Sequence, residues 1–219
     1  MKLTKLPYLI AIDGPAGSGK GTIAKLISKK LDLNYLDSGA IYRIIALAAT
    51  RENLRSEQAQ ELVSLVKKIN MRFESEEIFL NEEVVTNEIR ASEISQYSSE
   101  IAAHLALRAE ILSFQRAFYK GNGLVAEGRD MTTIVFPEAD LKIYLDASPQ
   151  ERAKRRYKQL IVKGNNVNMS DLTSEIEARD KRDIERKVSP LKVADEAIIL
   201  NTDDLTIDQT VNKILSFIT

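Results

Sequence analysis

A lysine and a hydroxyl behind a run of glycines carry the clearest chemical signal in this chain. The residues Gly14-Pro15-Ala16-Gly17-Ser18-Gly19-Lys20-Gly21-Thr22 follow the apolar segment Tyr8–Asp13 and precede a helical pattern that ends near Leu31. Successive backbone N–H groups of such a loop converge on phosphate oxygens, and the N-terminus of the following helix adds partial positive charge. Lys20 supplies a mobile cation for the same phosphates. The sequence therefore predicts a nucleotide-phosphate site, here called the phosphate loop, at residues 14–22.

The position after Lys20 departs from the usual phosphate-loop pattern, in which a Ser or Thr directly after the lysine holds Mg²⁺. Here Gly21 intervenes and Thr22 follows. We therefore assign no protein ligand to the metal and expect phosphates and water to hold Mg²⁺. The apolar strand before Glu127 places that carboxylate either near Mg²⁺ through water or in a hydrogen bond to the loop. Asp146 ends the next strand, and there a structural role is favoured.

Arginines gather in two charged segments of the second half of the chain. On helices, each group would share one face: Arg152, Arg155 and Arg156, then Arg179, Arg182, Asp183 and Arg186. A guanidinium binds phosphate oxygens bidentately and stays charged, which suits phosphoryl transfer. A solvated face with Asp–Arg pairs is the alternative. Beside a phosphate loop we favour substrate binding for the later group, and the earlier group stays open. Ser38, at an expected helix N-cap, and Arg43 mark a place for a second, acceptor phosphate.

Composition excludes several classes of function. The 219 residues include 31 basic and 32 acidic side chains, and a net charge of −1 argues against non-specific binding to nucleic acid or membranes. The absence of cysteine excludes disulfides and thiolate chemistry, and the single His104 disfavours a histidine metal site. Residues 1–7 lack the apolar core of a signal peptide, and no apolar run is long enough to span a bilayer. We expect a cytoplasmic monomer.

Apolar strands alternate with helical patterns along most of the chain. The expected strands are Tyr8–Asp13, Tyr35–Leu36, Leu124–Ala126, Leu141–Asp146 and Ala197–Leu200. This alternation predicts an α/β fold with a parallel sheet and helices on both faces. Two stretches interrupt it: residues 57–100, with a hairpin near Ile78–Val85 that turns at Asn81-Glu82, and the charged helical residues 148–190. Ser148, Pro149 and Glu151 predict a capping box at the start of the second stretch.

Six segments together resemble bacterial cytidylate kinases, which are nucleoside monophosphate kinases, over nearly the full chain. They are residues 12–22, 36–43, 128–131, 135–139, 145–148 and 179–183. The loop alone is generic, whereas Leu-Asp-Ser-Gly-Ala-Ile-Tyr-Arg and Gly-Arg-Asp-Met in this order are specific to the family. The resemblance implies one domain with a P-loop kinase fold and a five-stranded parallel sheet. Its core would cover about 1–56, 101–148 and 188–219, with an enlarged acceptor-binding insertion at about 57–100 and a helical lid with the following helix at about 149–187.

The resemblance also implies an activity, namely phosphorylation of CMP and dCMP by ATP with Mg²⁺ in pyrimidine nucleotide metabolism. Asp130 would accept a hydrogen bond from the cytosine 4-amino group, as carboxylates do when they read cytosine in nucleic acids. Arg108 and Ser99 would donate to N3 and O2. Asp183 would take the ribose hydroxyls, with Arg179 beside it.

Phosphate contacts follow from the same resemblance. Arg43, Arg129 and Arg186 would hold the acceptor phosphate, and Lys20 would bridge donor and acceptor. Lys20, Arg129 and Arg186 are thus the expected catalytic residues. Ser38 and Tyr42 are further substrate-binding residues, and Arg155 joins residues 14–22 in binding ATP.

Thr132 departs from the family pattern, in which glycine usually follows Gly-Arg-Asp-Met. A β-branched residue there would shift the turn at Arg129-Asp130 if the glycine were needed for a positive φ or a close backbone approach. Two other functions stay open from the sequence. One is a kinase for another monophosphate or a small hydroxyl metabolite, and the other is a nucleotide-dependent switch without an acceptor. The residues Asp130, Arg108 and Ser99 match cytosine and argue against the first function, and a switch would not need the second arginine cluster.

Overall fold

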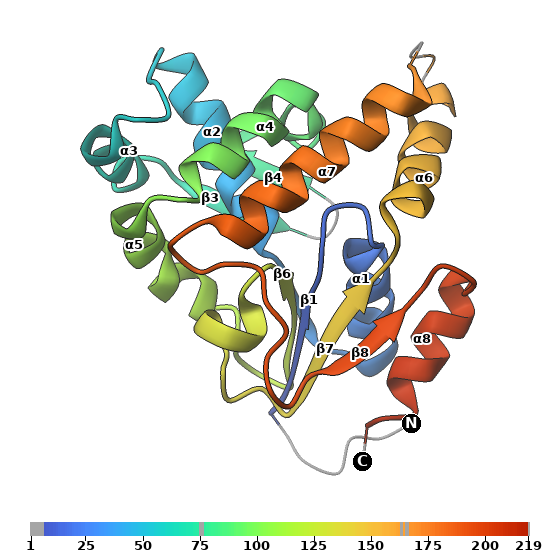
Figure 1. The fold of residues 1–219 in the computed structure, drawn as a ribbon. Coiled ribbons are helices and arrows are strands. Elements are labelled where there is room, and N and C mark those ends of the chain that lie inside the picture. The colour runs from blue at the N-terminus through green and yellow to red at the C-terminus, as the bar shows by residue number, and fades with distance from the viewer. Residues whose placement is uncertain (1–6, 75–76, 163, 165–166, 219) are drawn as a thin grey trace. The chain divides into compact units, whose positions relative to one another are not determined.

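The computed structural model describes residues 7–74, 77–162, 164 and 167–218 (Figure 1). The chain forms two compact units. The first unit comprises the residues up to 36 together with those from 118 onward, and the second unit comprises residues 37–117. In the described part of the chain, no helix combines the length and the apolar character needed to cross a bilayer.

A five-stranded parallel sheet forms the centre of the first unit, in the order β2-β6-β1-β7-β8 (Figure 1). The strands are β1 (Tyr8–Asp13), β2 (Asn34–Asp37), β6 (Gly123–Gly128), β7 (Leu141–Asp146) and β8 (Ile198–Asn201). The middle strand β1 pairs in parallel with β6, where Asp13 lies opposite Gly128, and with β7, where Asp13 lies opposite Tyr144. The parallel sheet predicted from the sequence is confirmed, and parallel strands bring their carboxyl ends to one edge.

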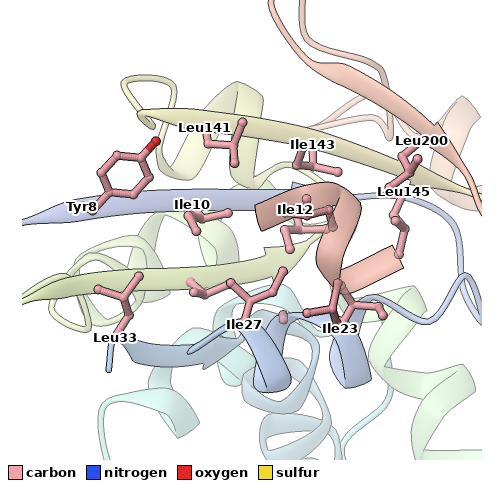
Figure 2. Close-up of a cluster of buried hydrophobic side chains, with 14 residues drawn as sticks. Tyr8, Ile10, Ile12, Ile23, Ile27, Leu33, Leu141, Ile143, Leu145 and Leu200 are labelled. Atoms are coloured by element: carbon pink, nitrogen blue, oxygen red, sulfur yellow. The ribbon is translucent and has the colours of Figure 1, made fainter. Parts of the chain in front are cut away.

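The helices α1 (Lys20–Leu31) and α8 (Ile207–Leu215) pack against each other and contribute to one buried cluster with the sheet. Figure 2 shows Ile10 and Ile12 of β1 near Ile143 of β7, with Ile23 and Ile27 of α1 facing them. Every residue of β1 is buried, including those whose side chains point to the opposite face. Burial on both faces explains why β1 reads as a continuous apolar run rather than an alternating one.

The charged segment after β7 folds into the helices α6 (Pro149–Val162) and α7 (Met169–Glu185), which pack against each other. The predicted capping box of α6 is half present. Glu151 N donates to Ser148 Oγ at 3.3 Å, but Ser148 N donates to Asp203 Oδ1 at 2.8 Å instead of to Glu151. The Glu151 carboxylate lies 3.6 Å from Arg155 Nε. The carboxylate of Asp203, distant in the sequence, has thus replaced the Glu151 carboxylate as the partner of Ser148 N.

The second unit combines four α-helices, a 3₁₀ turn and a small antiparallel sheet. Its elements are α2 (Ser38–Arg51), α3 (Ala59–Val66), β3 (Met71–Glu74), β4 (Glu77–Leu80), β5 (Glu83–Val84), η1 (Glu88–Arg90), α4 (Ser92–Ile101) and α5 (Leu105–Arg116). Helix α2 packs against α3, α4 and η1, and α3 packs against α5. Because α2 is buried along most of its length, it forms the centre of this unit.

The hairpin predicted near Ile78–Val85 is confirmed, and it is extended by a strand that the sequence did not reveal. Asn81 and Glu82 connect β4 to β5 with φ values of 48° and 70°, the left-handed region that a tight hairpin turn requires. The missed strand β3 pairs with β4. Arg72 of β3 lies 4.0 Å above the ring of Phe79 on β4, so a cross-strand cation–π contact supports a polar strand.

Candidate active site

The phosphate loop lies between β1 and α1, and its glycines are needed for two different reasons. Gly14 has a φ of +151°, and a Cβ on it would lie 2.1 Å from Leu145 O, so the loop passes directly against β7. Gly19, the N-cap of α1, has a φ of +95°, which other residues rarely adopt. The close approach at Gly14 and the turn at Gly19 therefore set the path of the loop backbone.

Lys20 is buried at the start of α1, and its Nζ donates to Pro15 O at 2.8 Å. Burial, and then the positive charge of Arg129, lower the pKa of Lys20 from 10.5 to about 7. The carboxylates of Glu127 and Asp13 act in the opposite direction but do not compensate. Lys20 is thus held within the loop that it was predicted to serve, in a setting that favours an incoming anion.

Glu127, at the end of β6, is buried beside the first turn of α1. A Cβ on Gly21 would lie 3.3 Å from Glu127 Oε1, a tight contact, so a side chain directly after Lys20 would crowd this carboxylate. In the described ranges, no three His, Cys, Asp or Glu side chains are grouped so that they could bind a metal. That phosphate and water hold Mg²⁺, with Glu127 as the nearby carboxylate, stays a prediction.

Asp13 joins the end of β1 to the turn that follows β6. Its carboxylate accepts hydrogen bonds from Met131 N at 2.8 Å, Thr132 N at 2.8 Å and Thr132 Oγ1 at 2.6 Å. Burial raises the pKa of Asp13 despite these three donors. Thr132 has no positive φ, and it lies in the π-helical turn Met131–Val135. The β-branched residue that departs from the family pattern therefore fits this turn and adds a hydroxyl donor to it.

Three arginines predicted to bind the acceptor nucleotide act on a single carboxylate, that of Asp183 on α7. Arg129 Nε donates to Asp183 Oδ2 at 2.8 Å, and Arg179 and Arg186 add positive charge nearby. Burial alone would raise the pKa of Asp183, but the arginines lower it below its usual value. Arg186 Nε also donates to Ser189 O at 2.6 Å. Asp130, next to Arg129, is buried. The structure thus brings five predicted site residues of the first unit into one region.

Arginines of α6 contact the phosphate loop from outside. Arg155 Nη1 donates to Ser18 O at 3.2 Å, and its other donors reach Thr202. Arg152, which the sequence left open, is almost fully buried and donates from Nη1 to Ala16 O at 2.9 Å. Arg155 therefore lies at the loop, as expected of a residue that binds ATP, and Arg152 is a second loop contact that the prediction of site residues omitted.

Ser38 does not cap α2, contrary to the sequence-based expectation. The N-cap is Asp37, whose Oδ1 accepts from Ala40 N at 2.8 Å, while Ser38 lies inside the first turn. Asp37 also pairs with Arg43, whose Nη2 lies 2.8 Å from Asp37 Oδ2. Ser38 Oγ instead accepts from the buried side chain of Gln115, at 2.8 Å. An aspartate caps as well as a serine does, so either residue satisfied the pattern.

The expected base-binding residues of the second unit come from α2, α4 and α5. The guanidinium of Arg108 lies 5.4 Å from the centroid of the Tyr42 ring, and its Nη1 donates to Ala102 O at 2.9 Å. Ser99 is buried, and its Oγ has no hydrogen-bond partner among the described residues. A buried hydroxyl without a protein partner is costly unless a ligand or water satisfies it. Ser99 thus has a hydroxyl available to a ligand, and the role of all three residues in binding the base stays a prediction.

The prediction of site residues omitted four residues whose contacts lie around the predicted ones. In the first unit they are Asp13, Arg152 and Asp180, which pairs with Arg152, and in the second unit Gln115. Asp13 carried a usable signal, because it is an acidic residue at the end of an apolar strand directly before the loop. The other three had only helical spacing, and their partners lie far away in the sequence.

Comparisons of the sequence with known proteins indicate one family. The family model described as "Cytidylate kinase" matches residues 10–219. A protein named Cytidylate kinase from Nitrosomonas europaea is 47% identical over 208 residues, which cover 95% of this chain and 93% of the relative. Another from Polynucleobacter necessarius is 47% identical over 212 residues, covering 97% and 99%. A third, from Vibrio cholerae, is 46% identical over 214 residues and covers 96% of this chain and 95% of the relative.

Proposed function

The chain belongs to the cytidylate kinase family, and from that premise we propose that it transfers the terminal phosphoryl group of ATP to CMP and dCMP. The products are ADP and CDP or dCDP. The observation that carries the proposal is a family match over residues 10–219 that includes both the phosphate loop and the arginines around Asp183. One group suits a donor triphosphate, and the other suits an acceptor monophosphate.

On the donor side, residues 14–22 bind the ATP phosphates through backbone N–H groups and the N-terminus of α1. Arg155 adds a cation at the end of the loop, beside Ser18. When bound, Mg²⁺ neutralises phosphate charge, and the phosphates, water and the nearby Glu127 would hold it. These contacts orient the terminal phosphoryl group for in-line transfer.

On the acceptor side, Arg43, Arg129 and Arg186 bind the phosphate of CMP. Asp183 and Arg179 form hydrogen bonds with the ribose hydroxyls. Asp130 accepts from the cytosine 4-amino group, and Arg108 and Ser99 donate to N3 and O2. Ser38 and Tyr42 contribute to the same substrate site. The buried Ser99 hydroxyl supports this assignment, because among the described residues it has no hydrogen-bond partner and can donate to the base.

Catalysis follows from charge and position rather than from proton transfer. The attacking phosphate oxygen of CMP is already ionised at neutral pH, so it needs no general base. Lys20, Arg129 and Arg186 stabilise the charge that spreads over the transferring group. The buried carboxylates Asp13 and Glu127 favour the charged forms of Lys20 and Arg129. We further propose that the protein works as a monomer in the cytoplasm.

An acceptor panel tests the proposal. ADP release is measured in a coupled assay with ATP and Mg²⁺ against CMP, dCMP, UMP, AMP, GMP and no acceptor. We expect fast turnover with CMP and dCMP, because uracil reverses the hydrogen-bonding pattern at position 4 and N3 and leaves buried polar groups unpaired. Activity led by another acceptor would contradict the cytosine assignment. Equal ADP release without an acceptor would contradict the kinase.

The roles in base recognition need a separate variant. Arg108→Met keeps the aliphatic length of the side chain and removes the donors, so we expect a raised KM for CMP with little change in the KM for ATP. The matched control is Arg116→Met, at an exposed position of the same helix α5. Equal effects of the two variants would contradict the assignment of Arg108.

A further inference from the structure

Arg152 has its hydrogen-bonding capacity almost filled by the protein. Its Nε donates to Ala147 O at 2.9 Å, and Nη1 donates both to Ala16 O at 2.9 Å and to Asp180 Oδ1 at 3.1 Å. Nη2 donates to Asp180 Oδ2. Four of its five N–H groups are thus used, and the side chain is almost fully buried. A guanidinium in this state is committed to three chain segments.

The contact with Ala16 O has a consequence on the other side of the loop. In a trans peptide the carbonyl of one residue and the N–H of the next point in opposite directions. A donor that fixes Ala16 O therefore also fixes the direction of Gly17 N–H, which points away from Arg152. Lys20 at Pro15 O and Arg155 at Ser18 O likewise fix the directions of Ala16 N–H and Gly19 N–H. Three carbonyls of the phosphate loop are thus held by cationic side chains.

We propose that Arg152, held by Asp180, is a positioning residue that preorganises the phosphate loop for triphosphate binding. Asp180 belongs to α7 and Arg152 to α6, so the ion pair fixes a helical hairpin and the loop through one guanidinium. Packing supports the same role, because a Cβ on Gly17 would lie 3.3 Å from Arg152 Cβ. The inference rests on the proposed function, in which this loop binds the phosphates of ATP.

Asp180→Asn is the main test, because it keeps the shape of the side chain and removes the charge that orients Arg152. We expect the Kd for ATP to rise about ten-fold or more, which corresponds to ~1.4 kcal/mol. The Kd for inorganic tripolyphosphate, which lacks adenine and ribose, should rise by the same factor. The Kd for CMP should change less than about two-fold. These values are measured by isothermal titration calorimetry on the full chain.

Arg152→Lys gives a second, independent variant if Asp180→Asn does not fold. A lysine keeps the charge but lacks the planar fork that lets Arg152 reach Ala147 O, Ala16 O and Asp180 together. The binding of ATP and of tripolyphosphate should therefore weaken by similar factors. The double variant, Asp180→Asn with Arg152→Lys, should bind ATP no more weakly than either single variant, since both substitutions break the same contact. Glu177→Gln, at an exposed position of α7, is the matched control and should bind ATP as the wild type does.

Four results would overturn the inference. ATP binding within two-fold of wild type in both single variants would remove the role of the ion pair, and so would equal weakening of ATP and CMP. Weaker binding of ATP together with an unchanged Kd for tripolyphosphate would place the effect at adenine or ribose. A wild-type protein that binds CMP but not ATP would instead refute the donor role of the loop in the proposed function, and the inference with it.

Discussion

Lys20 leads to a prediction about protons rather than about rate. In the ligand-free protein, burial and the charge of Arg129 hold the pKa of Lys20 at about 7, far below its ordinary 10.5. Phosphate oxygens of a bound nucleotide bring negative charge to this amine. An opposite charge within a few ångströms raises the pKa of a lysine by about 1–3 units. Nucleotide binding at alkaline pH should therefore draw a proton from solution.

The size of the uptake follows from these values. At about pH 8, a Lys20 with a pKa of about 7 is roughly nine-tenths neutral. If bound phosphate raises the pKa to about 9 or more, the lysine becomes roughly nine-tenths protonated. Binding then takes up about 0.8 proton per site. The nucleotide itself contributes little, because its phosphates have a last pKa of about 6 and are fully ionised under these conditions.

Calorimetric titration with ATP at about pH 8, in buffers of different ionisation enthalpy, measures this uptake as the slope of the observed heat against the buffer enthalpy. Lys20→Met is the matched control, because it keeps the aliphatic stem and should bind ATP more weakly with a slope near zero. A wild-type slope near zero would refute the reasoning, since Lys20 would then be charged before the nucleotide arrives. An equal slope in Lys20→Met would assign the proton to another group.

Three further variants test separate parts of the site. Arg129→Lys keeps the charge but loses the planar fork, so turnover should fall about 10²-fold or more, as a steady-state assay with saturating ATP and CMP would show. Thr132→Val removes a hydroxyl donor from the buried carboxylate of Asp13 and should lower the free energy of unfolding by about 1.5–3 kcal/mol in urea denaturation; an unchanged value would contradict the contact. Gly14→Ala would place a Cβ 2.1 Å from Leu145 O, so we expect little soluble protein or a large loss of melting temperature, and a wild-type melting curve would contradict the loop geometry.

The parts of the fold that local chemistry determines were predictable. The strand β1 could be predicted because all six of its residues are buried, and the phosphate loop could be predicted because its glycines respond to local demands of φ and space. The turn at Asn81-Glu82 carried a weaker signal, since asparagine tolerates the left-handed region that both residues adopt. Family resemblance added the roles of individual residues, which remain predictions.

Contacts across long sequence distances could not be predicted. Asp13 and Met131 are separated by 118 positions, and Arg152 and Ala16 by 136, so no local pattern relates them. The prediction of the N-cap of α2 failed for the opposite reason. Asp37 and Ser38 are adjacent and both suit an N-cap, and only tertiary contacts such as that between Gln115 and Ser38 distinguish them. The strand β3 depends on a cross-strand cation–π contact that its own sequence does not reveal.

The ion pair between Arg129 and Asp183 has a bearing on how substrates leave. Arg129 already has a carboxylate partner before any phosphate arrives, so its positive charge is partly balanced in the empty site. An acceptor phosphate must then share this guanidinium with Asp183, using the N–H groups that the carboxylate leaves available. The net gain on binding is smaller than an unpaired arginine would give, which limits how tightly a diphosphate product is retained. The site is thereby suited to short residence times and rapid emptying between turnovers.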